Sequence, residues 1–369
     1  MSRGGALGGA AAGLLLLAMP VPAAAQDEPL PPPQADDRFP EYEPPLDLTR
    51  PPAMPRYKPK KTAWGDPDLR GVWPVDSLGG LPLQRAEAQG NRVFLTREEY
   101  RATAERMRAS QEAYAREAKE DRIGMGHWVE MTGAGMRTSL LIDPPDGRLP
   151  PLTEEGKRRA ALMRSSWVPG QTFESFEDFD NWDRCVTRGF PASMLPFRYN
   201  NGIRIFQAPG QVAIQMEMLG TRLIPIAGEH WSPAVDGWLG SSIGRWEGNV
   251  LVVETTNIKP GASAINMGTM GAPPNNTLPM SAEARVTERF ALADRGTLVY
   301  EMTLSDPVVW QAPFTVRMDI PRNDQYRFFE YACHEGNVQI RNYITADRAR
   351  RAEEVAEANA ALALAGGGR

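Results

Sequence analysis

Residues Trp238–Asn257, WLGSSIGRWEGNVLVVETTN, are the stretch that best predicts the fold of this chain. Two runs of β-forming residues flank a short Gly/Asn turn at 247–249, as in a hairpin joined by a tight turn. In the second run, side chains from Leu251 to Glu254 alternate in character, the pattern of a strand with one covered face. The stretch therefore predicts a β-hairpin.

The same strand–turn–strand pattern continues on both sides of this hairpin. Further strands are expected at 203–207, 212–218, 222–226, 285–292, 297–304, 314–320 and 326–333. Most are joined by short turns without crossover helices, so neighbouring strands should run antiparallel. We expect a mainly β fold in which about nine strands form a meander closed into a barrel, since closure leaves no sheet edge. A two-sheet β-sandwich is the alternative.

The N-terminal residues predict export. Arg3 precedes an apolar run from Ala6 to Met19, and three alanines before Gln26 supply an A-x-A cleavage site, so 1–25 is expected to be a signal peptide. An uncleaved N-terminal membrane helix is the alternative, but the run is short for an anchor. No later stretch approaches about twenty apolar residues. We expect a periplasmic or secreted protein with no membrane span after signal cleavage.

Four regions follow the signal. Residues 26–61 are rich in proline and predict an extended linker or a surface arm. Residues 62–196 should be rich in helices and loops, with helices beginning after Thr96 and Thr153. Residues 197–345 form the expected β domain, within which the Gly/Pro/Asn-rich excursion 259–279 is a candidate flap. Residues 346–369 are an alanine-rich helical tail.

Charge and cysteine content exclude several classes of function. A net charge of −5 over 369 residues provides no basic surface for nucleic acid. In an oxidising compartment Cys185 and Cys333 predict one disulfide, which would close a loop of about 150 residues and stabilise the fold by about 4–5 kcal/mol. With three histidines and no metal-binding spacing, a metal site through Cys333 and His334 is disfavoured. No cofactor is expected, and nothing in the sequence sets the oligomeric state.

Five phrases in the sequence resemble a known family when taken in order. They are DPPDGRLPPL (143–152), RCVTRGFP (184–191), GRWEGNVLVVETT (244–256), TERF (287–290) and EYACHEGN (330–337). Together they are similar to motifs of a large family of uncharacterised exported bacterial proteins, over most of the chain from Trp64 to Tyr343. That resemblance implies export but no activity. A lipocalin-like barrel is suggested only by analogy of hairpin number.

The last expected strand contains the best candidate for acid–base chemistry. Glu330, His334 and Glu335 lie close together in the sequence. A glutamate at the mouth of a barrel, beside a histidine, could act as a general acid or base in an isomerisation, elimination or hydrolysis. The alternative is that Glu330 forms a structural ion pair with an arginine such as Arg245 or Arg289.

A second set of residues is a candidate for ligand binding. Arg245 could hold a carboxylate in a bidentate fork, or equally could pair with an acidic residue on a neighbouring strand. The remaining candidates are aromatic or polar side chains near the expected barrel mouth: Trp246, Glu247, His230 and Tyr331.

Three functions follow from these patterns. The first expectation is a barrel that binds a small, mostly apolar molecule, oriented by Arg245 or Glu330. The second is a lyase, isomerase or hydrolase that uses Glu330 and His334. The third is an envelope-associated structural domain with a filled interior.

Overall fold

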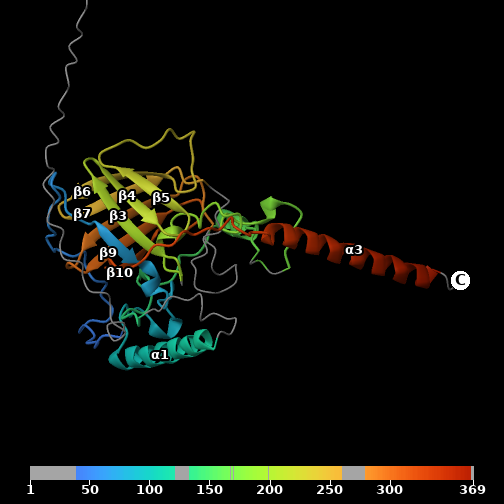
Figure 1. Ribbon diagram of the computed structural model, residues 1–369, viewed down its shortest axis with the longest axis horizontal. Coiled ribbons are helices and arrows are strands. Elements are labelled where there is room, and N and C mark those ends of the chain that lie inside the picture. The colour runs from blue at the N-terminus through green and yellow to red at the C-terminus, as the bar shows by residue number, and fades with distance from the viewer. Residues whose placement is uncertain are drawn as a thin grey trace, which may run out of the picture.

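The computed structural model describes residues 39–366 except 121–132, 167, 169, 198 and 260–278 (Figure 1). The expected signal peptide and nearly all of the expected flap at 259–279 therefore lie outside the described residues.

The hairpin expected at 238–257 is confirmed. Strands β6 (Ser241–Glu247) and β7 (Val250–Thr256) pair antiparallel, with Glu247 opposite Val250. Gly248 in the turn has a φ of 62°, which glycine adopts without steric cost. The centre of β7 is buried on both faces, because Val252 is as inaccessible as Leu251 and Val253.

The strands form two antiparallel sheets. The four-stranded sheet has the order β1 (Gly71–Pro74), β3 (Gly202–Ala208), β4 (Gln211–Met216), β5 (Gly220–Pro225). The six-stranded sheet has the order β2 (Leu141–Asp143), β10 (Phe314–Pro321), β9 (Thr297–Ser305), β8 (Arg285–Leu292), β7, β6. The sheets meet at one edge through a single bridge between Ile226 and Gly244. No closed barrel forms among the described strands, so a two-sheet sandwich is as consistent with this arrangement as a barrel.

One predicted strand is wrong. Residues 326–333 form turns and irregular backbone instead of a ninth strand of the meander. The free edge of β10 is occupied by β2, which comes from the N-terminal part of the chain and was not expected to be a strand. Residues 326–333 are held to the domain by side chains, as described below.

Two of the α-helices in the described ranges begin at their expected positions. Helix α1 (Arg97–Lys119) starts at a capping box in which Thr96 and Glu99 bond each other's backbone N–H groups. Helix α2 (Glu154–Ala161) follows the Thr153 cap. Helix α3 (Gln339–Gly366) starts earlier than expected and projects from the body of the molecule (Figure 1). No helix in the described ranges combines the length and the apolar character that crossing a bilayer requires.

Side chains fill the space between the two sheets. A single cluster of buried apolar residues joins both inner faces, with Trp73, Ile203 and Ile214 from one sheet and Phe290 and Phe314 from the other. These inner faces come from the alternating positions that the sequence predicted.

The proline-rich arm lies against the domain from residue 39 onward. Arg317 donates to the carbonyl oxygens of Pro52 and Ala53 at 3.0 and 3.2 Å, and Asn249 donates to that of Tyr57 at 3.1 Å. The segment 26–61 is thus a docked arm where it is described.

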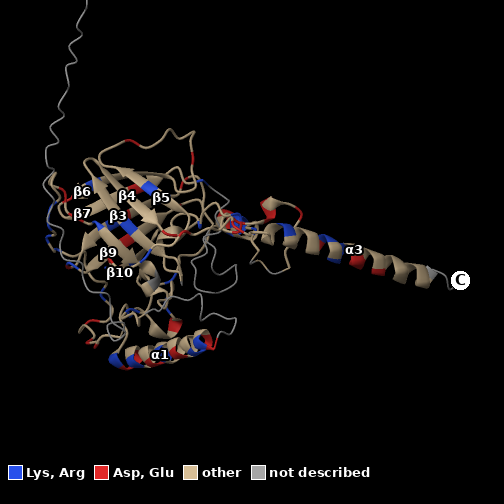
Figure 2. Cartoon of the chain, in the orientation of Figure 1, with Lys and Arg blue, Asp and Glu red and all other residues tan. Residues whose placement is uncertain are grey.

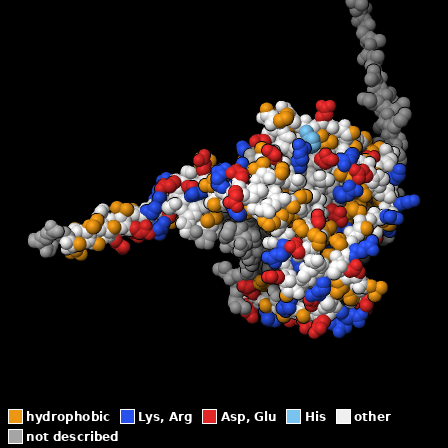
Figure 3. Space-filling view, turned by 180° about the vertical axis from the view of Figure 1, so that it is seen from behind, with side chains coloured by type: hydrophobic (Ala, Val, Ile, Leu, Met, Phe, Trp, Pro, Cys, Tyr) orange, Lys and Arg blue, Asp and Glu red, His pale blue; other side chains and the backbone are white. Residues whose placement is uncertain are grey.

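The face seen in Figure 3 mixes acidic and basic side chains and carries no extended basic field.

Candidate functional site

Arg188 is the most unusual side chain of the described structure. It belongs to the RCVTRGFP stretch, which leads through the short 3-10 helix Ala192–Met194 toward β3. Arg188 is 2% exposed, yet its Nε, Nη1 and Nη2 atoms have no hydrogen-bond partner among the described residues. A buried guanidinium normally pairs with a carboxylate or carbonyl, because an unpaired buried charge is costly.

Aromatic rings surround this guanidinium. Its central carbon lies 4.6 Å from the ring centroid of Phe197 and 5.7 Å from that of Trp182. The rings of Phe197 and Tyr199 meet edge to face at 4.7 Å. The Trp182 indole donates to the hydroxyl of Tyr331 at 3.2 Å. Cation–π attraction therefore supplies part of the stabilisation that hydrogen bonds do not.

Burial sets the protonation states in this cluster. Desolvation lowers the pKa of Arg188 to about 10, so the side chain stays charged at neutral pH. Desolvation, and then the neighbouring Tyr331, raises the pKa of Tyr199 to about 12, so this phenol stays neutral. The cluster consequently presents a cation and hydroxyl groups inside an aromatic wall, and we call it the Arg188 cluster (Trp182, Arg188, Phe197, Tyr199 and Tyr331).

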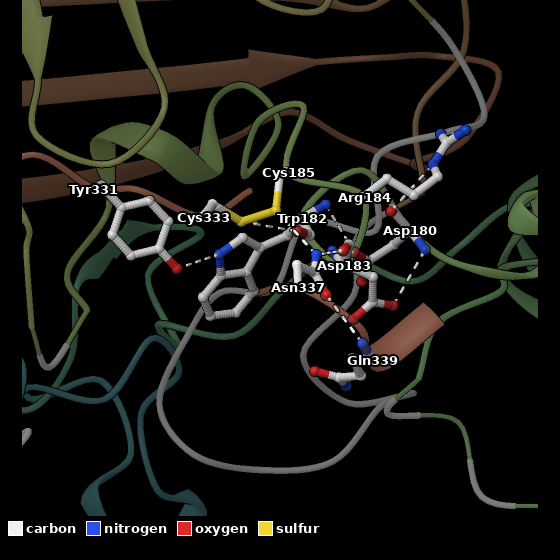
Figure 4. Close-up of a disulfide and its surroundings, with 9 residues drawn as sticks. All are labelled: Asp180, Trp182, Asp183, Arg184, Cys185, Tyr331, Cys333, Asn337 and Gln339. Carbon is white, nitrogen blue, oxygen red and sulfur yellow. Dashed lines mark hydrogen bonds between the residues drawn. A yellow bond between two sulfur atoms is a disulfide. The ribbon is translucent and has the colours of Figure 1, made fainter. Parts of the chain in front are cut away.

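The predicted disulfide fixes the two segments that build the cluster. Cys185 and Cys333 are bonded, with their Cα atoms 5.5 Å apart, which confirms the pairing expected from the cysteine count. Figure 4 shows Trp182 and Tyr331 on one side of the disulfide. On the other side, the carboxylates of Asp180 and Asp183 accept hydrogen bonds from backbone N–H groups and serine residues, so they are not paired with Arg188.

A second buried arginine shows what full pairing looks like in this protein. Arg222 on β5 donates to Glu288 on β8 at 2.8 and 2.5 Å, and also to the hydroxyls of Ser242 and Thr255. Its guanidinium lies 4.2 Å from the ring centroid of Phe190, two residues after Arg188. This pair joins the two sheets inside the core. Among the nitrogen atoms of Arg222, only Nε is left without a partner in the described chain.

The structure places Arg245 and Glu247 on the exposed face of β6. Arg245 pairs with Glu254 on the adjacent strand at 2.5 Å and with Glu247 at 2.9 Å. Glu247 also pairs with Arg289 on β8 at 3.1 Å. These side chains are 35–50% exposed and form a surface ion-pair network, in agreement with the alternative considered for Arg245.

Glu330, His334 and Glu335 are all exposed, on the irregular segment that flanks Cys333. No side-chain contact between Glu330 and His334 occurs in the described chain. The expectation that Glu330 lies on a barrel strand is wrong, because residues 326–333 are not a strand. None of these three residues belongs to the Arg188 cluster, whereas their neighbour Tyr331, predicted as a ligand-binding residue, does.

Trp246 and His230 lie apart from that cluster. Trp246 is half-buried against the apolar core, and its indole N–H has no partner among the described residues. His230 lies in the loop between β5 and β6, where its Nδ1 atom is 3.0 Å from the backbone oxygen of Ser241.

Sequence reasoning did not select Arg188, Phe197 or Tyr199. The mixture of acidic, basic and aromatic residues at 173–196 predicted a partly buried ion-pair region, and several pairs do form there, such as Arg164 with Asp178 at 2.8 Å. The position of Arg188 in a motif that also holds Cys185 is the one hint in the sequence, and it does not show that this arginine is left unpaired.

The described residues outside the Arg188 cluster form a groove but no metal-binding cluster. A groove of about 610 Å³ lies between the arm and α1, lined by basic and acidic residues in similar number together with three aromatic rings. It contains none of the predicted site residues. No group of three or more histidine, cysteine or acidic side chains in the described ranges is arranged to hold a metal ion.

Comparisons with models of protein families, with curated proteins and with solved structures found no match to this chain. The family resemblance stated from the five motifs stays a prediction.

Proposed function

We propose that this protein binds a small, mostly apolar molecule that carries one anionic group, and that Arg188 holds that group. The observation that carries the proposal is the buried guanidinium whose three nitrogen atoms lack partners in the described chain. A carboxylate is the natural complement, because its two oxygens match the planar fork of arginine.

The side chains around Arg188 indicate the chemical character of the rest of the ligand. Trp182, Phe197, Tyr199 and Tyr331 provide flat apolar surface, and the tyrosine hydroxyl groups provide hydrogen bonds for one or two polar atoms. This is the usual composition of a small-molecule site, which is largely apolar with a few placed polar groups. We therefore place the ligand at the Arg188 cluster and not between the sheets, where core side chains fill the space.

The compartment is part of the proposal. The signal-like residues 1–25 and the disulfide both favour a protein that works in the periplasm or outside the cell, where disulfides persist. A disulfide between segments 148 residues apart would not be maintained in a reducing cytoplasm.

The first experiment compares two buried arginines by substitution with methionine. Arg188→Met removes a charge that has no partner, so its free energy of unfolding should stay within about 1 kcal/mol of the original protein or rise. Arg222→Met leaves Glu288 buried without its partner and should lower that free energy by about 3–5 kcal/mol. A large loss of stability in Arg188→Met would mean that Arg188 is structural.

The second experiment measures binding. Benzoate, a longer aryl carboxylate and inorganic phosphate would be titrated while the fluorescence of the tryptophan residues is followed, with native mass spectrometry of protein from its own host to detect a retained ligand. Removing one partner of a buried charge pair costs about 2–5 kcal/mol, so Arg188→Met should weaken carboxylate binding by about 30-fold to 4000-fold. Equal affinity of the two proteins for every probe, or no binding by either, would refute the proposal.

A further inference from the structure

The segment 322–338, which we call the strap, carries Tyr331 and is fixed to the domain at one end by Glu217. The Glu217 residue follows β4 and is 7% exposed. Its carboxylate accepts hydrogen bonds from the Tyr326 hydroxyl at 2.8 Å and from the Phe329 N–H at 3.1 Å. The same carboxylate accepts the N–H of Gly202 at 3.1 Å. Residues 322 and 323 are held by backbone hydrogen bonds to Gly296 and Val72, whereas residues 326–329 dock on the Glu217 side chain and form no strand ladder.

The disulfide is the next attachment point along the strap. Tyr331 precedes Cys333 by two residues, and Arg188 follows Cys185 by three. The covalent bond thus joins the two short segments that bring a phenol and a guanidinium into one cluster. Figure 4 shows the strap residues Tyr331, Cys333 and Asn337 against the 180–185 segment.

The noncovalent contacts of the strap near the disulfide are hydrogen bonds. Tyr331 accepts a hydrogen bond from Trp182 at 3.2 Å and is also hydrogen-bonded to Tyr199. The side-chain amide of Asn337 donates to the backbone oxygen of Asp183 at 3.2 Å and lies 3.1 Å from the sulfur of Cys185. Each such bond contributes about 1 kcal/mol, so the disulfide is the covalent restraint that these weaker contacts supplement.

Beyond the disulfide, the chain is anchored again at the start of α3. The Tyr343 ring packs against Phe173 and Phe179 with centroids 5.0 and 6.0 Å away. Asp347 accepts the N–H of Phe173 at 3.1 Å. If the disulfide opens, residues 330–338 become a loop whose two ends stay attached, so this part of the strap can swing out without unfolding the sheets.

We infer that the Cys185–Cys333 disulfide is a redox latch on the Arg188 cluster. Oxidised, it holds Tyr331 over the bound anion; reduced, it lets the strap open and the ligand leave. A dithiol reductant supplies the two electrons and two protons: its thiolate attacks the half-buried Cys333 sulfur, Cys185 leaves as the thiol, and the second thiol of the reductant releases Cys333 as it closes its own disulfide. This inference rests on the proposed function.

The test uses the full-length protein and a carboxylate probe that the binding titration has shown to bind. Dissociation rate and Kd would be measured before and after treatment with dithiothreitol, and for the double variant Cys185→Ser/Cys333→Ser. The double variant with dithiothreitol is the control for effects of the reductant that do not involve the disulfide. Hydrogen exchange would report where the chain loosens.

Opening the disulfide should raise the dissociation rate at least about tenfold and weaken Kd about tenfold. Amide protection should be lost in 330–338 and retained in β7–β9. Unchanged kinetics on reduction, in protein that binds the probe through Arg188, would overturn the latch but leave the proposed function standing. Loss of protection throughout the sheets would also overturn it, because the disulfide would then be a general structural crosslink. Absence of binding in the oxidised protein is a failure of the proposed function instead.

Discussion

Replacing Glu288 by glutamine should destabilise the fold by about 3–5 kcal/mol, because it leaves the Arg222 guanidinium buried without a counter-charge. The two side chains are 0% and 1% exposed and meet through bonds of 2.8 and 2.5 Å. Glu288 also accepts the Tyr300 hydroxyl at 3.0 Å. An amide in its place directs N–H donors at a cation or at a hydroxyl, so the remaining polar groups cannot all be satisfied.

The double variant Arg222→Met/Glu288→Met distinguishes the net contribution of the ion pair to stability from the cost of leaving one charge buried without its partner. With both charges removed, the Ser242 and Thr255 hydroxyls can still bond each other at 2.9 Å, and only Tyr300 loses an acceptor, at a cost of about 1 kcal/mol. Replacing a buried pair by apolar residues of similar size is often neutral or stabilising. The double variant should therefore be more stable than Glu288→Gln by about 2 kcal/mol or more.

Urea unfolding followed by tryptophan fluorescence and circular dichroism measures these differences. A matched control lies in the same sheet: the Arg245–Glu254 pair has a bond of 2.5 Å, but its side chains are 49% and 50% exposed. Removing that pair should change stability by less than about 1 kcal/mol. A cost below about 1 kcal/mol for Glu288→Gln, or a double variant less stable than the single one, would refute the reasoning.

Two further predictions concern the loops. Burial, and then the neighbouring Asp183 carboxylate, raises the pKa of Asp180 from 3.8 to about 6. The folded protein therefore binds this proton more tightly than the unfolded chain does. The free energy of unfolding should consequently fall as the pH rises between about 4 and 6. Asp180→Asn should flatten this part of the pH profile of urea midpoints, and an unchanged slope would contradict the assignment. Gly147 has a φ of 64° and an added Cβ would lie 2.7 Å from the Arg85 guanidinium carbon, so Gly147→Ala should cost about 1–3 kcal/mol in thermal unfolding. Gly248→Ala, with a φ of 62° and open space around it, is the control and should cost less.

Helix α1 carries both signs of charge along its length, whereas the charged residues of α3 lie in the part nearer its start (Figure 2). Most of α3 beyond Asp347 is exposed, including Leu362 and Leu364 at 70% and 83%. Near its start, Arg351 pairs with Glu174, which holds the helix to the 173–179 segment.

Local patterns predicted most of the regular structure. Eight of the nine expected strands are present, because alternation along a strand depends on neighbouring residues and a nearby covered face. The capping residues Thr96 and Thr153 fixed two helix starts for the same reason, since a cap acts within one turn.

The ninth strand shows where such patterns mislead. Residues 326–333 carry closely spaced aromatic residues, as strands do, but the N–H of Phe329 bonds to the Glu217 carboxylate and the Phe328 ring lies over Arg204 at 4.6 Å. The edge of β10 had already been taken by β2. Strand pairing depends on which distant segment reaches an edge, and a single sequence does not encode that locally.

The sequence by itself determined the hairpin at 238–257, the strand and helix positions around it, and the pairing of its only two cysteines. Each depends on residue spacing or on a count. Only the tertiary structure decided that the strands divide into two sheets, that the arm docks, and that Arg222 finds a carboxylate while Arg188 does not. The physical reason is that burial and charge pairing are set by segments brought together from far along the chain, so two buried arginines, each preceded by a threonine, can end in opposite electrostatic environments.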